Sequence, residues 1–224
     1  MVLNNIKGQL IVSCQALEDE PLHSSYVMAK MAKAVEEGGA KGIRAQSVED
    51  INEIMKVCDL PVIGIIKRQY KDSDIYITPT QKEIKELLQT SCQIIALDAT
   101  NRKRPNNEKC KDLVDLIHEN HRLAMADCST YEECVEAQEM GFDIVSTTLC
   151  GYTDYSENYE GPNFPLIKKC VKELNVPIIA EGKINTPEDL KEVYRCGVHS
   201  AVVGSAITRP QLITKNFVKV LKEE

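Results

Sequence analysis

Short apolar runs rich in β-branched residues alternate with longer segments of helical period from residue 9 almost to the end of the chain. This alternation is typical of β/α units whose strands lie parallel in one sheet. There are eight runs, more than an open doubly wound sheet usually has. We predict a closed (β/α)8 TIM barrel formed by residues 1–224 as a single domain. The expected strands cover residues 9–15, 41–46, 61–67, 92–99, 123–128, 143–149, 177–182 and 200–205.

The segments between these runs carry signals for helix ends. Thr130 is followed three residues later by Glu133, and Thr186 precedes Pro187, as at many helix N termini. Gly141 and Gly197 stand where helices should stop before the next strand. The expected helices cover residues 24–37, 47–57, 80–90, 107–120, 130–140, 164–174, 187–196 and 210–222.

Composition excludes several classes of partner. The formal net charge of -7 argues against a nucleic-acid or anionic-membrane surface. No apolar run approaches the roughly 20 residues of a membrane helix. The nine cysteines are odd in number and include no CxxC pair, and the segment MVLNNIKGQL lacks the apolar core of a signal peptide. We therefore expect reduced thiols in a soluble, cytoplasmic protein.

A polar residue ends nearly every predicted strand. The carboxyl ends of barrel strands build the active site, so such residues are functional candidates. Burying them without partners would cost several kcal/mol each. In chain order they are Gln15, Arg44, Lys67, Asp98, Asp127, Thr147 or Thr148, Glu181 and the Gly204–Ser205 turn.

Lys67 is the leading catalytic candidate. In PVIGIIK the residues Ile63, Ile65 and Lys67 share one face of the strand. If that face points into the barrel, the amine stands in its mouth, partly desolvated, where its pKa falls toward neutrality. Such a lysine suits proton abstraction or Schiff-base formation. Glu181 could orient or neutralise it, and the alternative is a structural buried ion pair.

The last two strand-end loops resemble a phosphate-binding site. Barrels often bind phosphate with the loops after strands seven and eight. Here the loops read EGKINTPED and VVGSAITRP. Gly182, Lys183, Gly204, Ser205 and Arg209 would supply amides, a hydroxyl and positive charge.

We expect no metal and no cofactor. We interpret His118 and His121 as part of a solvated helix end, and no group of His, Asp or Glu residues has the spacing of zinc ligands. Asp98 and Asp127 could hold a hard cation, although we favour hydroxyl binding. The sequence contains neither a nucleotide-binding P-loop motif nor a dinucleotide-binding glycine motif.

Two long loops are candidate lids. Segment 67–79 contains the β-like run IYIT and could form a hairpin over the barrel mouth. Segment 150–163 holds three tyrosines. Ordinary surface loops are the alternative for both.

Motifs along essentially the whole chain resemble the N-acetylmannosamine-6-phosphate 2-epimerases of bacterial sialic acid breakdown. The motifs that carry the resemblance are IVSCQALEDEPLHS, GIRAQ, PVIGIIKR, ALDATNRKRP, MADCST, GFDIVSTTLCGYT, IIAEGKINTPED and AVVGSAITRP. The resemblance implies a barrel of the ribulose-phosphate-binding type. It also implies interconversion of N-acetylmannosamine 6-phosphate and N-acetylglucosamine 6-phosphate, by proton removal and return at C2, without a redox cofactor or required metal.

The resemblance further assigns roles to residues. The lysine that matches Lys67 is the catalytic base, and the glutamate that matches Glu181 assists it. The substrate-binding positions match Gln15, Arg44, Asp127 and Arg209. The resemblance also suggests a homodimer, for which residues 212–224 are a plausible contact. The group that returns the proton to C2 is left open.

One position departs from the family pattern. The eighth-strand turn usually reads GGAITRP, whereas this chain has Ser205 in place of the second glycine. A turn that needs positive φ there would be strained by about 1 kcal/mol or more. Phosphate affinity is the property that this departure affects.

Two rival functions remain open. A strand-end lysine suits a Schiff-base aldolase or lyase of a phosphorylated sugar equally well. A non-catalytic phosphosugar-binding regulator could also keep the barrel, but it would have no need for both Lys67 and Glu181.

Overall fold

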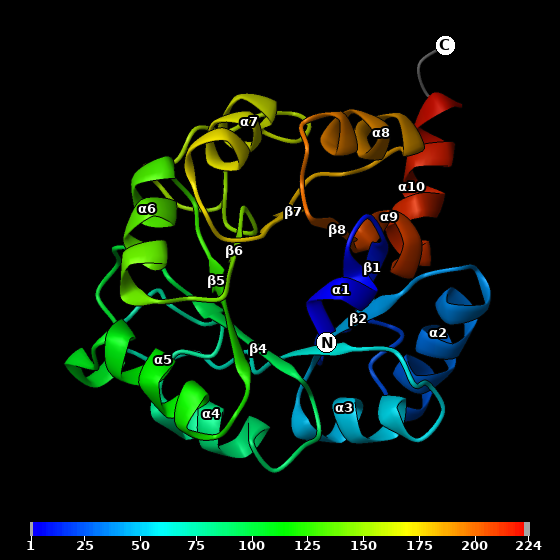
Figure 1. The fold of residues 1–224 in the computed structure, drawn as a ribbon. Helices are drawn as coiled ribbons and strands as arrows, with labels where there is room; N and C mark the ends of the chain where they lie inside the picture. The colour runs from blue at the N-terminus through cyan, green and yellow to red at the C-terminus, as the bar shows by residue number, and fades with distance from the viewer. Residues whose placement is uncertain (1, 222–224) are drawn as a thin grey trace.

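Eight parallel strands close into a barrel in the order β1 to β8, in a computed structural model that describes residues 2–221 (Figure 1). Each strand pairs with the next, and β8 pairs with β1 through Leu10 opposite Ala201. The predicted TIM barrel is therefore confirmed. The strands are β1 (Leu10–Cys14), β2 (Gly42–Gln46), β3 (Val62–Ile65), β4 (Ile94–Asp98), β5 (Leu123–Asp127), β6 (Ile144–Ser146), β7 (Ile178–Glu181) and β8 (Ser200–Val203).

Alternation along each strand separates two apolar layers. One set of side chains, including Ile63, Ile65 and Ile179, fills the barrel interior. The other set packs between the strands and the surrounding helices. Since Lys67 continues the parity of Ile63 and Ile65, and Glu181 that of Ile179, both stand above the interior layer, as predicted.

The helices form a ring outside the strands (Figure 1). Thr130 and Thr186 form the predicted N-terminal capping boxes, and Gly141 ends its helix at φ 92°. The principal helices are α2 (Ser25–Glu37), α3 (Val48–Met55), α4 (Gln81–Leu87), α5 (Cys110–Glu119), α6 (Tyr131–Met140), α7 (Phe164–Glu173), α8 (Pro187–Arg195) and α10 (Pro210–Val220).

Several details differ from the sequence prediction, and many strands and helices are a few residues shorter than expected. The helix expected from residue 107 begins at Cys110, because Asn106 and Asn107 adopt φ 56° and 54°. These two residues belong to a short 3₁₀ turn (η1, Pro105–Asn107) that precedes the helix. Two short helices were not predicted, α1 (Val2–Ile6) and α9 (Ser205–Thr208). In α1, Ile6 is 1% exposed and packs into the barrel interior. Residues 222–224, part of the expected helix 210–222 and dimer contact 212–224, lie outside the described residues, as does residue 1 of the predicted domain.

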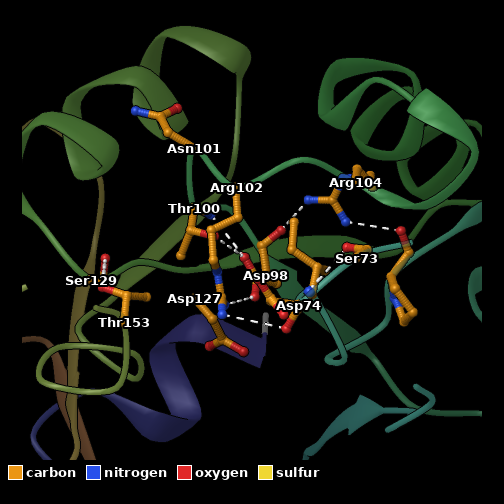
Figure 2. A network of polar contacts seen from close by, with 12 residues as sticks. Ser73, Asp74, Asp98, Thr100, Asn101, Arg102, Arg104, Asp127, Ser129 and Thr153 are labelled. Atoms are coloured by element: carbon orange, nitrogen blue, oxygen red, sulfur yellow. Dashed lines mark hydrogen bonds and ion pairs between the residues drawn. The ribbon is translucent and has the colours of Figure 1, made fainter. Parts of the chain in front are cut away.

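The predicted hairpin at residues 67–79 is present. Antiparallel bridges join Lys67 to Ile77 and Tyr70 to Ser73. The hairpin is tied to the loop after β4, because Ser73 donates to the carbonyl of Lys103 at 2.6 Å and Arg104 donates to that of Pro79 at 3.0 Å (Figure 2).

The loop over residues 150–163 is held at several points. Tyr155 donates to Glu133 at 2.5 Å, and Thr153 donates to Ser129 at 3.1 Å.

Among residues 2–221 no helix is long and apolar enough to cross a membrane.

Candidate active site

A cavity of about 290 Å³ opens at the carboxyl ends of the strands. Residues of β1, β2, β3, β7 and β8 line it, as do residues of the loops after β1, β3, β6, β7 and β8. Nine of the residues predicted for the site meet here: Gln15, Arg44, Lys67, Glu181, Gly182, Lys183, Gly204, Ser205 and Arg209. The barrel thus gathers at one surface positions spread over almost the whole chain.

Lys67 reaches the cavity from the first residues after β3. Burial, with the nearby cations of Arg44 and Arg209, lowers the pKa of its amine to about 8, although Glu181 and Glu20 act in the opposite direction. At neutral pH a useful fraction of this amine is unprotonated and can accept a proton.

Arg44, which lines the cavity, connects two carboxylates. Its Nη1 and Nη2 donate to the two oxygens of Asp127 at 3.0 and 2.5 Å, and Nη1 also donates to Oε2 of Glu181 at 2.7 Å. Arg44 is 1% exposed and Asp127 is fully buried. Burial opposes the charge of Arg44, but Asp127 and Glu181 outweigh this and raise its pKa. Burial raises the pKa of Glu181, while Arg44 counteracts the rise.

Asp127 lies behind Arg44 and does not line the cavity. Both of its oxygens are occupied, since Thr148 adds a 2.7 Å bond to the two from Arg44. The structure therefore gives Asp127 a direct role in holding Arg44.

Thr148, one of the two threonines predicted as alternatives at the end of the sixth strand, is the one that lines the cavity. Its hydroxyl lies 2.7 Å from Asp127 and 3.3 Å from Glu181, and Ser146 is 2.8 Å away. Its place two residues after β6 was the available signal, but sequence alone left Thr147 and Thr148 indistinguishable. Thr147 instead bonds the backbone of Glu181.

Gln15 offers an unpaired acceptor. The side chain is 8% exposed, and its Nε2 donates to Ser13 at 2.8 Å. Its Oε1 is buried without a hydrogen-bond partner. Because a buried unpaired oxygen costs about 1–3 kcal/mol, this oxygen is suited to receive an N–H or O–H group of a ligand.

Two glycines shape the loops after β7 and β8. Gly182 adopts φ 105°, a conformation that residues with a side chain rarely adopt. A Cβ on Gly204 would lie 3.3 Å from that of Ser13. Ser205 does not have positive φ and begins α9, so the strain considered for it does not arise. Its hydroxyl accepts a bond from Arg209 at 3.1 Å.

The ammonium group of Lys183 is engaged with the 150–163 loop. It donates to the carbonyl of Tyr159 at 2.7 Å and to the side chain of Asn158. It also lies 5.6 Å from the ring centre of Tyr152. Lys183 lines the cavity, yet its charge is directed to this loop.

Asp98 serves the loop after its own strand. It accepts bonds from Thr100 at 2.7 Å and from Arg102 at 2.6 Å, and Arg102 continues to the carbonyl of Asp74 at 3.3 Å (Figure 2). It is fully buried and does not line the cavity. Within the described chain, no group of three or more His, Cys, Asp or Glu side chains could hold a metal ion.

The polar cavity at the strand ends holds a lysine of lowered pKa together with an ion-paired glutamate. In a closed β/α barrel, this arrangement defines a TIM-barrel enzyme equipped for proton transfer. A family model described as "Putative N-acetylmannosamine-6-phosphate epimerase" matches residues 28–223. The chain belongs to this N-acetylmannosamine-6-phosphate 2-epimerase family.

Relatives extend the match over nearly the whole chain. A "Putative N-acetylmannosamine-6-phosphate 2-epimerase" of Clostridioides difficile is 66% identical over 221 residues, covering 99% of both chains. A protein of the same description from Clostridium perfringens is 62% identical, covering 99% of this chain and 100% of the relative.

Solved structures agree with this family assignment and with the barrel fold. The N-acetylmannosamine-6-phosphate 2-epimerase from Clostridium perfringens superposes with a TM-score of 0.97 at 61% identity, covering 98% of this chain and 96% of that one. A thiamine phosphate pyrophosphorylase from Pyrococcus furiosus shares the fold alone, with a TM-score of 0.62 at 16% identity over 93% of this chain and 90% of that one.

Proposed function

We propose that this protein interconverts N-acetylmannosamine 6-phosphate and N-acetylglucosamine 6-phosphate in the breakdown of N-acetylneuraminate, as an N-acylglucosamine-6-phosphate 2-epimerase. Lys67 removes the proton at C2 of the open-chain sugar, next to the C1 aldehyde, and a proton returns to the opposite face. The reaction needs only proton transfer and stabilisation of an enediolate, so no redox cofactor or metal enters it.

The observation that carries the proposal is the environment of Lys67. Its lowered pKa matches a base that works near neutrality. Glu181, which shares the cavity, assists it and stays oriented by its ion pair with Arg44. The buried cation of Arg44 favours the negative charge that develops on the sugar.

The substrate's functional groups match the rest of the cavity. The free Oε1 of Gln15 suits the amide N–H of an N-acyl sugar. The loops with Gly182, Lys183, Gly204 and Ser205 supply backbone amides and a hydroxyl for the 6-phosphate, and Arg209 supplies a cation. Arg44 and Asp127 complete the proposed substrate-binding set, Asp127 acting through Arg44.

The test is an NMR assay of N-acetylmannosamine 6-phosphate in deuterated water. We expect conversion to the gluco epimer with incorporation of deuterium at C2 and no carbon–carbon cleavage. Absence of exchange and conversion would refute the proposal. Borohydride trapping separates it from the aldolase, because a substrate adduct on Lys67 requires an imine that epimerisation by proton transfer does not form.

The proposal extends to the state of the protein. We propose that residues 1–224 form one domain and that the protein is a cytoplasmic homodimer. Two exposed apolar residues support a dimer contact in this segment: Phe217 of α10 is 76% exposed, and Leu221, directly after the helix, is 78% exposed. Light scattering coupled to size exclusion tests the dimer: a mass of one chain at micromolar concentration would refute it.

A further inference from the structure

Glu20 holds Arg209 from outside the cavity. Glu20 lies in the loop after β1, and Arg209 lies between α9 and α10, 189 residues further along the chain. Nη2 of Arg209 donates to Oε2 of Glu20 at 2.8 Å, and Nε lies 2.6 Å from Oε1. Arg209 lines the cavity, whereas Glu20 does not.

The contacts occupy one edge of the guanidinium group. The carboxylate faces the edge formed by Nε and Nη2, although the Nε hydrogen is not aligned for a hydrogen bond. Ser205 accepts one bond from Nη1. A guanidinium carries five N–H donors in a rigid plane, so fixing one edge fixes the direction of the remaining donors on Nη1 and Nη2.

Glu20 is itself held in place. Its Oε2 also accepts the backbone N–H of Leu17 at 2.8 Å, and its Oε1 accepts a bond from Gln211 at 3.1 Å. Partial burial opposes the negative charge, but the hydrogen bonds from Arg209 and Leu17, together with the positive charges of Arg209 and Lys67, outweigh it and lower the pKa of Glu20. The carboxylate therefore remains ionised at neutral pH and joins the first β/α unit to the last.

We propose that Glu20 is a positioning residue for the substrate's phosphate: it locks the plane of Arg209 so that the free edge of the guanidinium faces the phosphate dianion in the cavity. The inference rests on the proposed function, since Arg209 is assigned to a phosphorylated sugar there. Arg209 touches the ligand, and Glu20 acts only through Arg209.

Binding of inorganic phosphate tests this directly, by isothermal titration of Glu20→Asp, Glu20→Gln and the control Asp19→Asn. Aspartate keeps the charge, but its side chain is one methylene too short to reach Arg209 from the same backbone position. Glutamine keeps the length but loses the charge. We expect the dissociation constant to rise about tenfold for Glu20→Asp and at least about threefold for Glu20→Gln. Asp19 is exposed on the same loop, so its variant should stay within about twofold of the parent.

An unchanged dissociation constant in both Glu20 variants would overturn the proposal. Tighter binding by Glu20→Gln would also overturn it, because Glu20 would then compete with phosphate for Arg209. A double-mutant cycle adds a second criterion: in an Arg209→Gln background, Glu20→Gln should have no further effect on phosphate binding. A full additive effect there would show that Glu20 acts on the loop and not through Arg209.

Turnover separates this inference from the proposed function. In the epimerase assay, Glu20→Gln should raise KM with kcat within about twofold, whereas a general loss of structure would lower kcat as well. If the parent protein shows no epimerisation, the proposed function fails, while the phosphate titration still decides whether Glu20 positions Arg209.

Discussion

Arg44 on β2 and Glu181 on β7 are joined by a 2.7 Å ion pair between Nη1 and Oε2, although neither strand pairs with the other. The pair fixes one oxygen of Glu181 at the wall of the cavity, which both residues line. It also sets opposing charges around Lys67, because Arg44 lowers the pKa of the lysine and Glu181 raises it. The protonation of Lys67, the proposed base, thus depends on two residues that are themselves paired.

Replacing the base should stop proton transfer. We expect Lys67→Met to lower kcat by about a thousandfold, in the usual range for loss of a general base. C2 proton exchange by NMR measures the loss, and substrate titration should show retained binding. Turnover within tenfold of the parent would contradict the role.

The rate should depend on pH through Lys67. Its pKa of about 8 means that the neutral, reactive amine increases as pH rises through 8, so kcat/KM should rise from pH 7 and level off above about 9. Arg209→Gln removes a cation that lowers this pKa, and the midpoint should move to higher pH. Lys41→Gln, a change of the same charge just before β2 at the opposite end of the barrel, should leave the midpoint in place.

Loss of Arg44 should destabilise the fold. Arg44→Met leaves the fully buried Asp127 without its ion pair, and breaking a buried pair in this way costs about 3–5 kcal/mol. Urea denaturation measures the free energy of unfolding. The double variant Arg44→Met with Asp127→Leu should recover a large part of the loss, and equal stability of the single variant and the parent would disprove the argument.

The hydroxyl of Thr148 should influence Glu181. Its hydrogen bond counteracts the burial that raises the pKa of Glu181. Thr148→Val keeps the shape and removes the bond, so the acidic limb of the pH profile should shift to higher pH. We expect kcat/KM to fall by about tenfold at pH 6. Thr148→Ser should restore the profile, and Thr90→Val, a buried hydroxyl that bonds Leu87, should not alter it.

Lys183 should control the order of the 150–163 loop. Lys183→Met removes the bonds to Tyr159 and Asn158, so amide exchange in residues 156–160 should accelerate by about tenfold. Hydrogen exchange with mass spectrometry measures this, with the exposed Lys168→Met on α7 as the control. Unchanged exchange would show that other contacts hold the loop.

The barrel was predictable because strand parity and helix caps are local signals. Ile63, Ile65 and Lys67 share one face whatever the tertiary structure, and Thr130 caps α6 through residues three positions away. Helix α1 carried no such signal, because it is too short for a helical period and depends on the packing of Ile6 into the barrel.

The hydrogen-bond and ion-pair partners of the site residues could not be predicted from the sequence, for a different reason. Asp127 and Lys183 are polar residues near strand ends, and sequence could not show that one turns to Arg44 and the other to the 150–163 loop. Glu20 was not singled out at all, since its partner Arg209 is adjacent only after β8 pairs with β1. Contacts between distant residues follow from closure of the barrel.

The contact between Glu20 and Arg209 has a consequence during protein synthesis. The loop after β1 leaves the ribosome early, whereas Arg209 follows β8, the last strand to be made. A nascent chain that already contains Lys67 and Glu181 still lacks both the closing strand and the arginine. The proposed phosphate-binding residues after β8 are therefore made last, and a chain that ends before them cannot form the complete cavity.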